Sequence, residues 1–186
     1  DDGHNTGIIA EKLLAKGLVP VVIGFPKSLV KASSALNSKI ERRVLDEVSE
    51  AAVAAFCQDL TASYPGLQGF VHLQPNDFKV AKHEAQSQQL LAAVFLFAKN
   101  LKTQLAQPEH CFITVARGDG GLGYASGLAN IELMQMGLSG LCKTLKQEWP
   151  QTLCRALDIA PSIEGSELAS LLCAEILDSE IALSEV

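Results

Sequence analysis

Residues 1–26, DDGHNTGIIAEKLLAKGLVPVVIGFP, contain the signals that decide the fold. A glycine-containing turn leads into an apolar segment with helical spacing at residues 8–16, and Gly17 ends that helix. Residues 19–25 are then a continuous run rich in β-branched side chains and closed by a proline, which is typical of a strand buried on both faces. Turn, helix and buried strand in this order predict one unit of a parallel α/β sheet.

The same alternation continues to the end of the chain. Further strands are expected at 39–45, 69–74, 111–116 and 153–159, and further helices at 46–64, 83–107, 128–148 and 166–177. This order predicts an α/β fold, a doubly wound, truncated Rossmann-like parallel sheet with helices on both faces. We expect a single domain over residues 1–186, because no linker or repeat divides it. Asp1 and Asp2 stand where a strand would end, so the first strand is expected to be truncated.

The composition is that of an ordinary globular domain, with 48% hydrophobic and 19% charged residues. The net charge of −6 is spread without long runs, so neither nucleic acid nor an anionic membrane is expected as a partner. Five widely spaced cysteines without a C-x-x-C pair predict reduced, buried thiols in a cytoplasmic protein. The longest apolar stretch, residues 90–98, is too short to span a bilayer, and no signal peptide is recognisable.

The opening turn could serve more than one chemistry. It fits D-x-H-x-x-G, which resembles the cobalamin-binding signature whose His is the lower cobalt ligand, through Asp2-Gly3-His4-Asn5-Thr6-Gly7. That family also needs a Ser-x-Leu at the end of a later strand and a Gly-Gly soon after it. Here Ser34-Ala35-Leu36 is expected in a loop and Gly120-Gly121 comes far later. A cobalamin or other small-ligand site therefore stays an alternative to a surface His in a turn.

The pair Asp1-Asp2 also resembles the acidic pair of response-regulator receivers, which binds Mg²⁺ beside an acceptor Asp. The acceptor should end a later strand, but GFVHLQ at 69–74 has no carboxylate there, and Asp77 lies beyond it. The receiver interpretation is therefore disfavoured.

A second glycine-rich segment at 118–123, GDGGLG, matches the G-x-G-x-x-G dinucleotide fingerprint between an expected strand and an expected helix. Asp119 would direct a negative charge at a pyrophosphate, and no acidic residue is expected at the end of the next strand to hold a ribose. We interpret the segment as a loop without a ligand, with a nucleotide-using enzyme as the alternative. The sequence also has no G-x-S-x-G, and its four histidines lack metal-site spacing; His72, inside an apolar strand, is expected to be a core residue.

Residues 3–17 resemble the T-G-x-x-x-G-x-G turn and first helix of short-chain reductases, with Gly3 and Gly7 in register and Ile9 in place of the third glycine. A bulky side chain and nearby carboxylates oppose an anionic cofactor. That family transfers a proton with a Tyr and a Lys four residues later. Here Gln68 follows Tyr64 at that spacing and Leu128 follows Tyr124, while Arg117 and Asp119 occupy the loop of the family's catalytic Ser. No catalytic, cofactor-binding or metal-ligating residue is therefore expected.

A short-chain reductase-like chain without these sites resembles the structural subdomain of ketoreductases in modular polyketide synthases. The version in bacterial polyunsaturated fatty acid synthases, large multifunctional subunits, is similar in VLDEVSEAAVAAFCQDL, GFVHLQP, GLANIELMQMGLSGLCKTLKQEWP and CRALDIAP. The resemblance implies a noncatalytic subdomain with no cofactor of its own. It implies as partners a catalytic subdomain downstream, which reduces β-ketoacyl chains with NADPH, and the acyl carrier domains that hold those chains on phosphopantetheine.

The segment LLAAVFLFA at residues 90–98 is apolar on more than one side of its expected helix. It could be sandwiched within its own domain or could pack against a neighbouring one, and the sequence leaves both open.

Overall fold

The computed structural model describes residues 1–75, 84–124 and 133–186. The helices are α1 (Thr6–Ala15), α2 (Glu50–Ser63), α3 (Glu84–Leu105), α4 (Leu133–Glu148) and α5 (Gly165–Ile176), and the strands are β1 (Val21–Gly24), β2 (Glu41–Val44), β3 (Gly69–Leu73), β4 (Cys111–Ala116) and β5 (Leu153–Asp158). Every expected helix and strand is present. The expected first residues of the third and fourth helices, His83 and Leu128, lie outside the described residues, as does Asp77.

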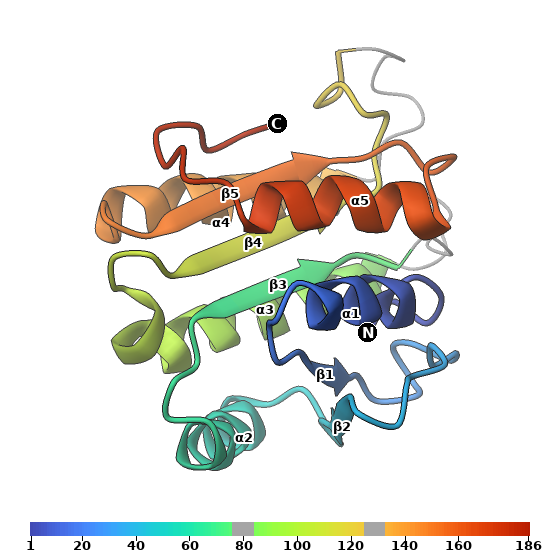
Figure 1. Ribbon diagram of the computed structural model, residues 1–186, viewed down its shortest axis with the longest axis vertical. Coiled ribbons are helices and arrows are strands. Elements are labelled where there is room, and N and C mark those ends of the chain that lie inside the picture. The colour runs from blue at the N-terminus through green and yellow to red at the C-terminus, as the bar shows by residue number, and fades with distance from the viewer. Residues whose placement is uncertain (76–83, 125–132) are drawn as a thin grey trace.

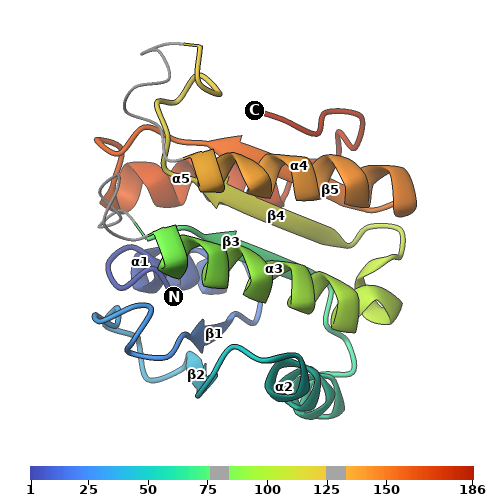
Figure 2. The same ribbon diagram turned by 180° about the vertical axis from the view of Figure 1, so that it is seen from behind.

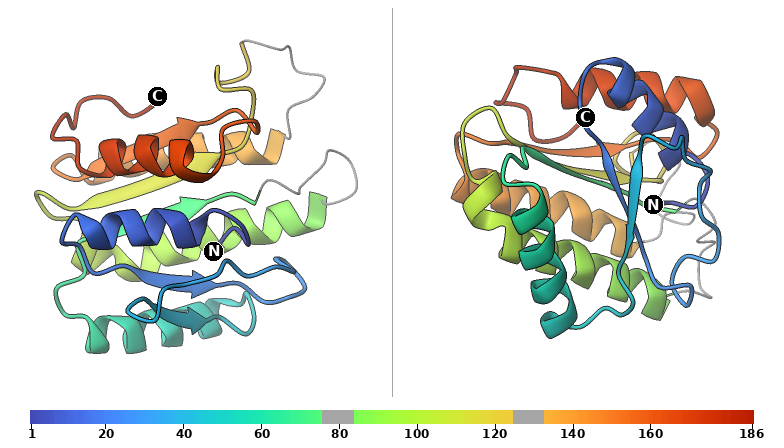
Figure 3. Two further views of the ribbon diagram at one scale, coloured as in Figure 1. Left: turned by 45° about the vertical axis from the view of Figure 1, so that its right-hand side comes forward. Right: turned by 60° about the horizontal axis from the view of Figure 1, so that its bottom comes forward.

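The strands are all parallel, and the helices cover both faces of them (Figures 1 and 2). β1 pairs with β2, and β3, β4 and β5 form a second ladder in that order. Helices α1 and α5 lie side by side over one face, as Figure 3 shows, while α3 and α4 cover the other. This arrangement confirms the truncated Rossmann-like α/β fold. It differs from the expectation in one respect, because β1 and β3 do not pair and the strands form two separate ladders.

Local signals explain where the elements begin and end. The Ser49 hydroxyl accepts a hydrogen bond from the Ala52 amide at 3.2 Å and so caps α2. That helix ends at Ser63, and its C-cap residue Tyr64 directly precedes the Pro65-Gly66 pair. All six residues of β5 are buried, because helices cover both faces of this strand.

An aromatic stack forms the core beneath α3 and α4. The centroid of the Phe70 ring lies 5.1 Å from that of Phe97 and 5.0 Å from that of Phe112. The Trp149 ring contacts Phe112 edge-on. Helix α3 packs against α2, α4 and the strands, so its apolar segment is sandwiched within its own domain. Phe95 is the one large hydrophobic side chain of α3 with a mostly exposed surface among its described residues.

The C-terminal segment lies along the outer edge of β5. The Ala156 amide donates to the Ser184 carbonyl at 2.9 Å, and the Val186 amide donates back to the Ala156 carbonyl at 3.0 Å. The buried Arg155 guanidinium donates to the carboxylates of Glu175 and Asp178 at 2.6 and 2.7 Å. This buried cation ties the end of α5 and the following segment to the sheet.

All five cysteines are free thiols and four of them are buried, as the sequence predicts. Burial raises the pKa of the Cys57 and Cys154 thiols to about 12, so these thiols stay protonated at neutral pH. No helix in the described part of the chain is long and apolar enough to cross a bilayer.

Candidate functional site

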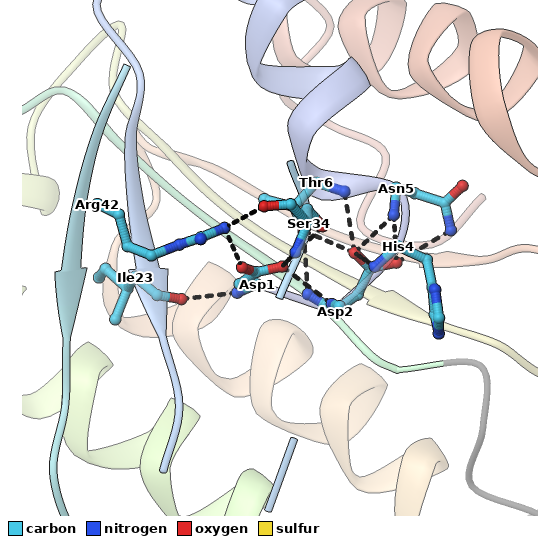
Figure 4. Close-up of polar contacts among 9 residues, drawn as sticks. Asp1, Asp2, His4, Asn5, Thr6, Ile23, Ser34 and Arg42 are labelled. Carbon is cyan, nitrogen blue, oxygen red and sulfur yellow. Dashed lines mark hydrogen bonds and ion pairs between the residues drawn. The ribbon is translucent and has the colours of Figure 1, made fainter. Parts of the chain in front are cut away.

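Two glycine-containing segments lie beside the carboxyl ends of the parallel strands, which is where this architecture binds ligands. The first, here called the first turn, is residues 1–7 and leads into α1. The second, here called the glycine loop, is residues 117–123 and follows β4. Figure 4 shows the side chains of the first turn.

The Asp2 carboxylate occupies the N-terminus of α1. It accepts hydrogen bonds from the backbone amides of His4 at 3.1 Å, Asn5 at 2.9 Å and Thr6 at 2.9 Å. The Thr6 hydroxyl at 2.7 Å and the Asn5 side-chain amide at 3.0 Å complete the set (Figure 4). Three backbone amides at the start of α1 and just before it are therefore already bonded to a carboxylate of the same turn.

These bonds also keep Asp2 ionised. Burial of this side chain opposes the charged form and by itself would raise the pKa of the carboxyl. The hydrogen bonds from Thr6, Asn5 and the backbone outweigh that penalty and lower the pKa below its usual value. Asp2 is thus a buried anion that the turn itself stabilises.

The Asp1 carboxylate connects the turn to the next loop and to β2. It accepts hydrogen bonds from the Gly3 amide at 2.9 Å and the Ser34 hydroxyl at 2.8 Å. Arg42 donates one Nη2 hydrogen to Asp1 at 2.7 Å and another to the Ser34 carbonyl at 2.6 Å. Both carboxylates of the expected acidic pair are therefore used within the protein.

The glycines of the first turn allow close packing against the loop that follows β1. Gly3 has φ +87°, and a Cβ on Gly7 would lie 2.0 Å from the Ala35 carbonyl oxygen. Ile9, expected to stand where a backbone approaches a pyrophosphate, is instead buried and belongs to the core cluster that includes residues of β3, β4, β5 and α5. The buried Ile9 side chain therefore contributes nothing to the surface of the turn.

A carboxylate also occupies the glycine loop, and it comes from the end of the next strand. Asp158 is an acidic residue at the end of β5, the next strand, where none was expected. It accepts hydrogen bonds from the amides of Gly118 at 2.8 Å, Leu122 at 2.9 Å and Gly121 at 3.2 Å. Asp119 accepts from Gly121 at 2.9 Å and Gly123 at 3.0 Å, so this side chain points back into its own loop.

Arg117 is buried where the reductase family would place its catalytic Ser. Its Nη2 donates to the carbonyls of Pro161 at 3.2 Å and Ile163 at 2.8 Å, and its backbone amide donates to the Gln135 side chain at 2.7 Å. Burial lowers the pKa of this guanidinium, which nevertheless stays a cation at neutral pH. The group therefore ties the end of β4 to the loop before α5 and carries no hydroxyl.

Neither tyrosine is placed as a proton donor. The Tyr64 hydroxyl donates to Glu41, and this bond raises the pKa of the phenol, whereas a neighbouring Lys would lower it. Tyr64 lies beside β2, at the end of α2. Tyr124 follows the glycine loop with 93% of its side chain exposed, and Leu128, the residue at the Lys spacing, lies outside the described residues.

Two of the described histidines, His4 and His72, differ in their surroundings. His4 lies on the exposed surface of the first turn, and its backbone amide donates to Asp2. His72 is buried, its Nε2 lies 3.0 Å from the Gln74 side-chain oxygen, and burial lowers its pKa to about 4, so it is a neutral core residue as expected. Within the three described ranges, no group of three His, Cys, Asp or Glu side chains could hold a metal ion.

Comparison with solved structures identifies the fold as that of short-chain dehydrogenases and reductases. A metagenomic short-chain oxidoreductase in complex with NADP superposes with a TM-score of 0.69 and 18% identity, over 100% of this chain and 91% of its own. The citronellol catabolism dehydrogenase of Pseudomonas aeruginosa superposes with a TM-score of 0.69 and 15% identity, over 99% of this chain and 88% of its own. A putative short-chain dehydrogenase of Shigella flexneri complexed with NADP superposes with a TM-score of 0.69 and 13% identity, over 96% of this chain and 90% of its own. No family model matches the sequence, and no curated protein matches it either.

These neighbours correct the expectation that this domain carries no cofactor. Solved structures of this fold hold NADP, so the fold is a nucleotide-binding one. The first turn nevertheless fits a nucleotide phosphate poorly, because the Asp2 carboxylate already accepts hydrogen bonds from the amides of residues 4–6. A phosphate at this helix end would have to displace that buried carboxylate.

Proposed function

We propose that this chain is the noncatalytic structural subdomain of a β-ketoacyl reductase within a polyunsaturated fatty acid synthase. In this role it stabilises a separate catalytic subdomain, which reduces acyl-carrier-bound chains with NADPH. The observation that carries the proposal is which residues follow the tyrosines in the sequence. The chain has two, and neither is paired with a Lys at the spacing that a short-chain reductase needs.

The segments that carry the family resemblance support a structural role, because they contribute mainly to packing. VLDEVSEAAVAAFCQDL forms most of α2 and buries Val53, Cys57 and Leu60. GFVHLQP contains β3, whose Phe70 joins the aromatic stack. CRALDIAP contains most of β5, the strand with every residue buried.

A surface for the catalytic subdomain is available at the C-terminal end. Ten large hydrophobic side chains are exposed in the described part of the chain, and five of them belong to α5 and the segment after it: Leu171, Leu177, Ile181, Leu183 and Val186. Exposed apolar side chains gathered along one segment indicate an interaction surface. Arg155 and the pairing with β5 hold this segment in place, so it is presented in an ordered form.

The first test measures activity. The chain alone is mixed with NADPH and a β-ketoacyl thioester, and NADPH oxidation is followed by absorbance. We expect no turnover above the rate without protein, because the chain has no Tyr–Lys pair to supply the proton. Turnover that is abolished by Tyr64→Phe or Tyr124→Phe would overturn the noncatalytic assignment.

The second test measures association with a ketoreductase catalytic subdomain that carries the Tyr–Lys pair. We expect a 1:1 complex by size-exclusion chromatography and a slower loss of reductase activity on heating. Leu183→Glu should weaken the complex, whereas Phe95→Glu on α3 should leave it unchanged, although both side chains are 55% exposed. If Phe95→Glu weakened the complex and Leu183→Glu did not, the interaction surface would lie on α3. If no complex formed, the proposed structural role would be wrong.

A further inference from the structure

The negative charge of the chain is concentrated after β5. Residues 159–186 contain six acidic side chains and no Lys or Arg, whereas residues 1–158 contain 15 acidic and 15 basic side chains and are neutral. The whole net charge of −6 therefore belongs to α5 and the segments beside it. No run of like charges marks this part of the sequence, because uncharged residues separate the six, which are Glu164, Glu167, Glu175, Asp178, Glu180 and Glu185.

The segment after α5 also exposes apolar side chains. It runs along the outer edge of β5 to the end marked C in Figure 1, and Ile181, Leu183 and Val186 are exposed on it. Acidic residues are interspersed with them, since Glu180 precedes Ile181 and Glu185 lies between Leu183 and Val186. We call these five residues the C-terminal surface. Apolar side chains that are exposed together indicate a place where another molecule binds.

Arg155 holds the C-terminal surface in place from below. Besides its two carboxylate partners, the guanidinium donates to the backbone carbonyls of Glu180 and Leu183. Its side chain is only 1% exposed, so its positive charge is not presented to a partner. The Glu180 side chain, by contrast, is exposed. The surface is therefore acidic and already ordered, which reduces the conformational entropy lost on binding.

The combination of apolar and acidic side chains favours one class of partner. An anionic lipid surface and nucleic acid would both be repelled by the carboxylates. A second copy bound through the same surface would bring Glu180 and Glu185 of each copy close to those of the other, which opposes association. A protein surface with an apolar centre and basic side chains around it would match both the exposed apolar groups and the charge.

We propose that the C-terminal surface binds a protein surface that carries Lys and Arg side chains around an apolar centre. Burial of Ile181, Leu183 and Val186 contributes affinity, and the charges speed the encounter and orient the two surfaces. The identity of the partner rests on the proposed function, under which it is the catalytic subdomain. The charge of the partner follows from the acidic residues of this chain and does not depend on that function.

Two helical peptides of about 18 residues serve as probes for the charge of the partner. Both carry Leu on one face, and the other face carries Lys in one peptide and Glu in the second. Fluorescence anisotropy measures their binding to the chain. We expect the Lys peptide to bind at least about tenfold more tightly at low salt, and the difference to shrink toward about 0.5 M NaCl. Equal affinities of the two peptides at low salt would overturn the proposal.

Matched charge substitutions locate the binding of the Lys peptide. Glu180→Lys should weaken it about fivefold, whereas Glu47→Lys, in the loop after β2, should change it less than about twofold. The two glutamates are a matched pair, because both are exposed and each accepts a hydrogen bond within the chain. Equal effects would mean that the peptide responds only to the net charge of the chain, and the proposal would be wrong.

A second matched pair tests the apolar part of the surface. Leu183→Ser should weaken binding of the Lys peptide about threefold or more, because apolar area is no longer buried. Phe95→Ser on α3 should leave the affinity unchanged, although both side chains are 55% exposed. If Phe95→Ser had the larger effect, the peptide would bind to α3 and the proposal would be wrong.

A ketoreductase catalytic subdomain separates this inference from the proposed function. If the peptides behave as expected but the subdomain forms no complex with the chain, the proposed function is wrong and the inference about charge stands. If the complex forms but its dissociation constant is the same at about 50 and 500 mM NaCl, and Glu180→Lys does not weaken it, the inference is wrong and the proposed function stands.

Discussion

The first turn and the glycine loop lie beside the carboxyl ends of the same sheet, and a carboxylate accepts the backbone amides of both. In the first turn the acceptor is Asp2, which belongs to the turn itself. In the glycine loop the main acceptor is Asp158, which comes 40 residues after Gly118. The glycine-rich turns of this chain can therefore be filled by a protein carboxylate from either source, and a local sequence pattern reveals only the first.

The largest expected difference is in stability. Asp2→Ala should lower the free energy of unfolding by about 3 kcal/mol or more, because the buried Asn5 amide and the partly buried Thr6 amide lose a charged acceptor. Asp158→Ala should cost about 1–2 kcal/mol, because its partners in the glycine loop are only partly buried. Urea unfolding of both variants measures the difference, and Asp2→Asn should recover part of the loss as a neutral cap. A larger cost for Asp158→Ala would reverse the comparison.

The glycines provide the next contrast. A Cβ on Gly7 would meet the Ala35 carbonyl oxygen at 2.0 Å, and this backbone atom can move only with its loop. A Cβ on Gly118 would meet Asp158 Oδ1 at 2.4 Å, and this side chain can rotate away. We expect Gly7→Ala to cost about 2–3 kcal/mol and Gly118→Ala about 1 kcal/mol in thermal unfolding. If the two substitutions lowered the free energy of unfolding equally, the loop after β1 would move as easily as the Asp158 side chain.

The pH dependence tests the buried His72. Burial lowers the pKa of its imidazole to about 4 in the folded chain, against about 6.5 when unfolded, so the unfolded chain binds more protons between these values. Stability should therefore decrease by roughly 2–3 kcal/mol as the pH falls from 6.5 to 4. Urea unfolding at the two pH values measures the decrease.

His72→Gln provides the control, because it removes the titrating imidazole. The decrease between pH 6.5 and pH 4 should be smaller in this variant. If His72→Gln leaves the decrease intact, the imidazole is not its source.

The smallest expected effect concerns the nucleotide. Asp2→Asn removes a negative charge from the N-terminus of α1 and should tighten NADPH binding about two- to fivefold. Asp119→Asn in the glycine loop should change the affinity for NADPH less if the nucleotide phosphate binds at the first turn. Fluorescence titration with NADPH compares the two, and a stronger effect of Asp119→Asn would place the phosphate at the glycine loop instead.

Much of the fold follows from the sequence because its signals are local. Gly17 and the apolar run after it predict α1 and β1 with small errors at their ends. The missing Lys after Tyr64 and Tyr124 follows from spacing alone. The role of Asp158 was missed, because its partners lie in a loop that is distant in sequence. Ile9 was expected to oppose a pyrophosphate through its bulk, whereas the structure buries its side chain in the core.

The alternation of helices and parallel strands and the lack of a Tyr–Lys pair can be predicted from the sequence, because periodicity and spacing are properties of neighbouring residues. Which carboxylate fills each glycine turn, and where the sheet is interrupted, depends on tertiary contacts. The bond from Asp1 to Ile23 joins residues 22 apart, and that from Asp158 to Gly118 joins residues 40 apart. Such contacts depend on how the helices pack on the strands, and no local pattern encodes that packing.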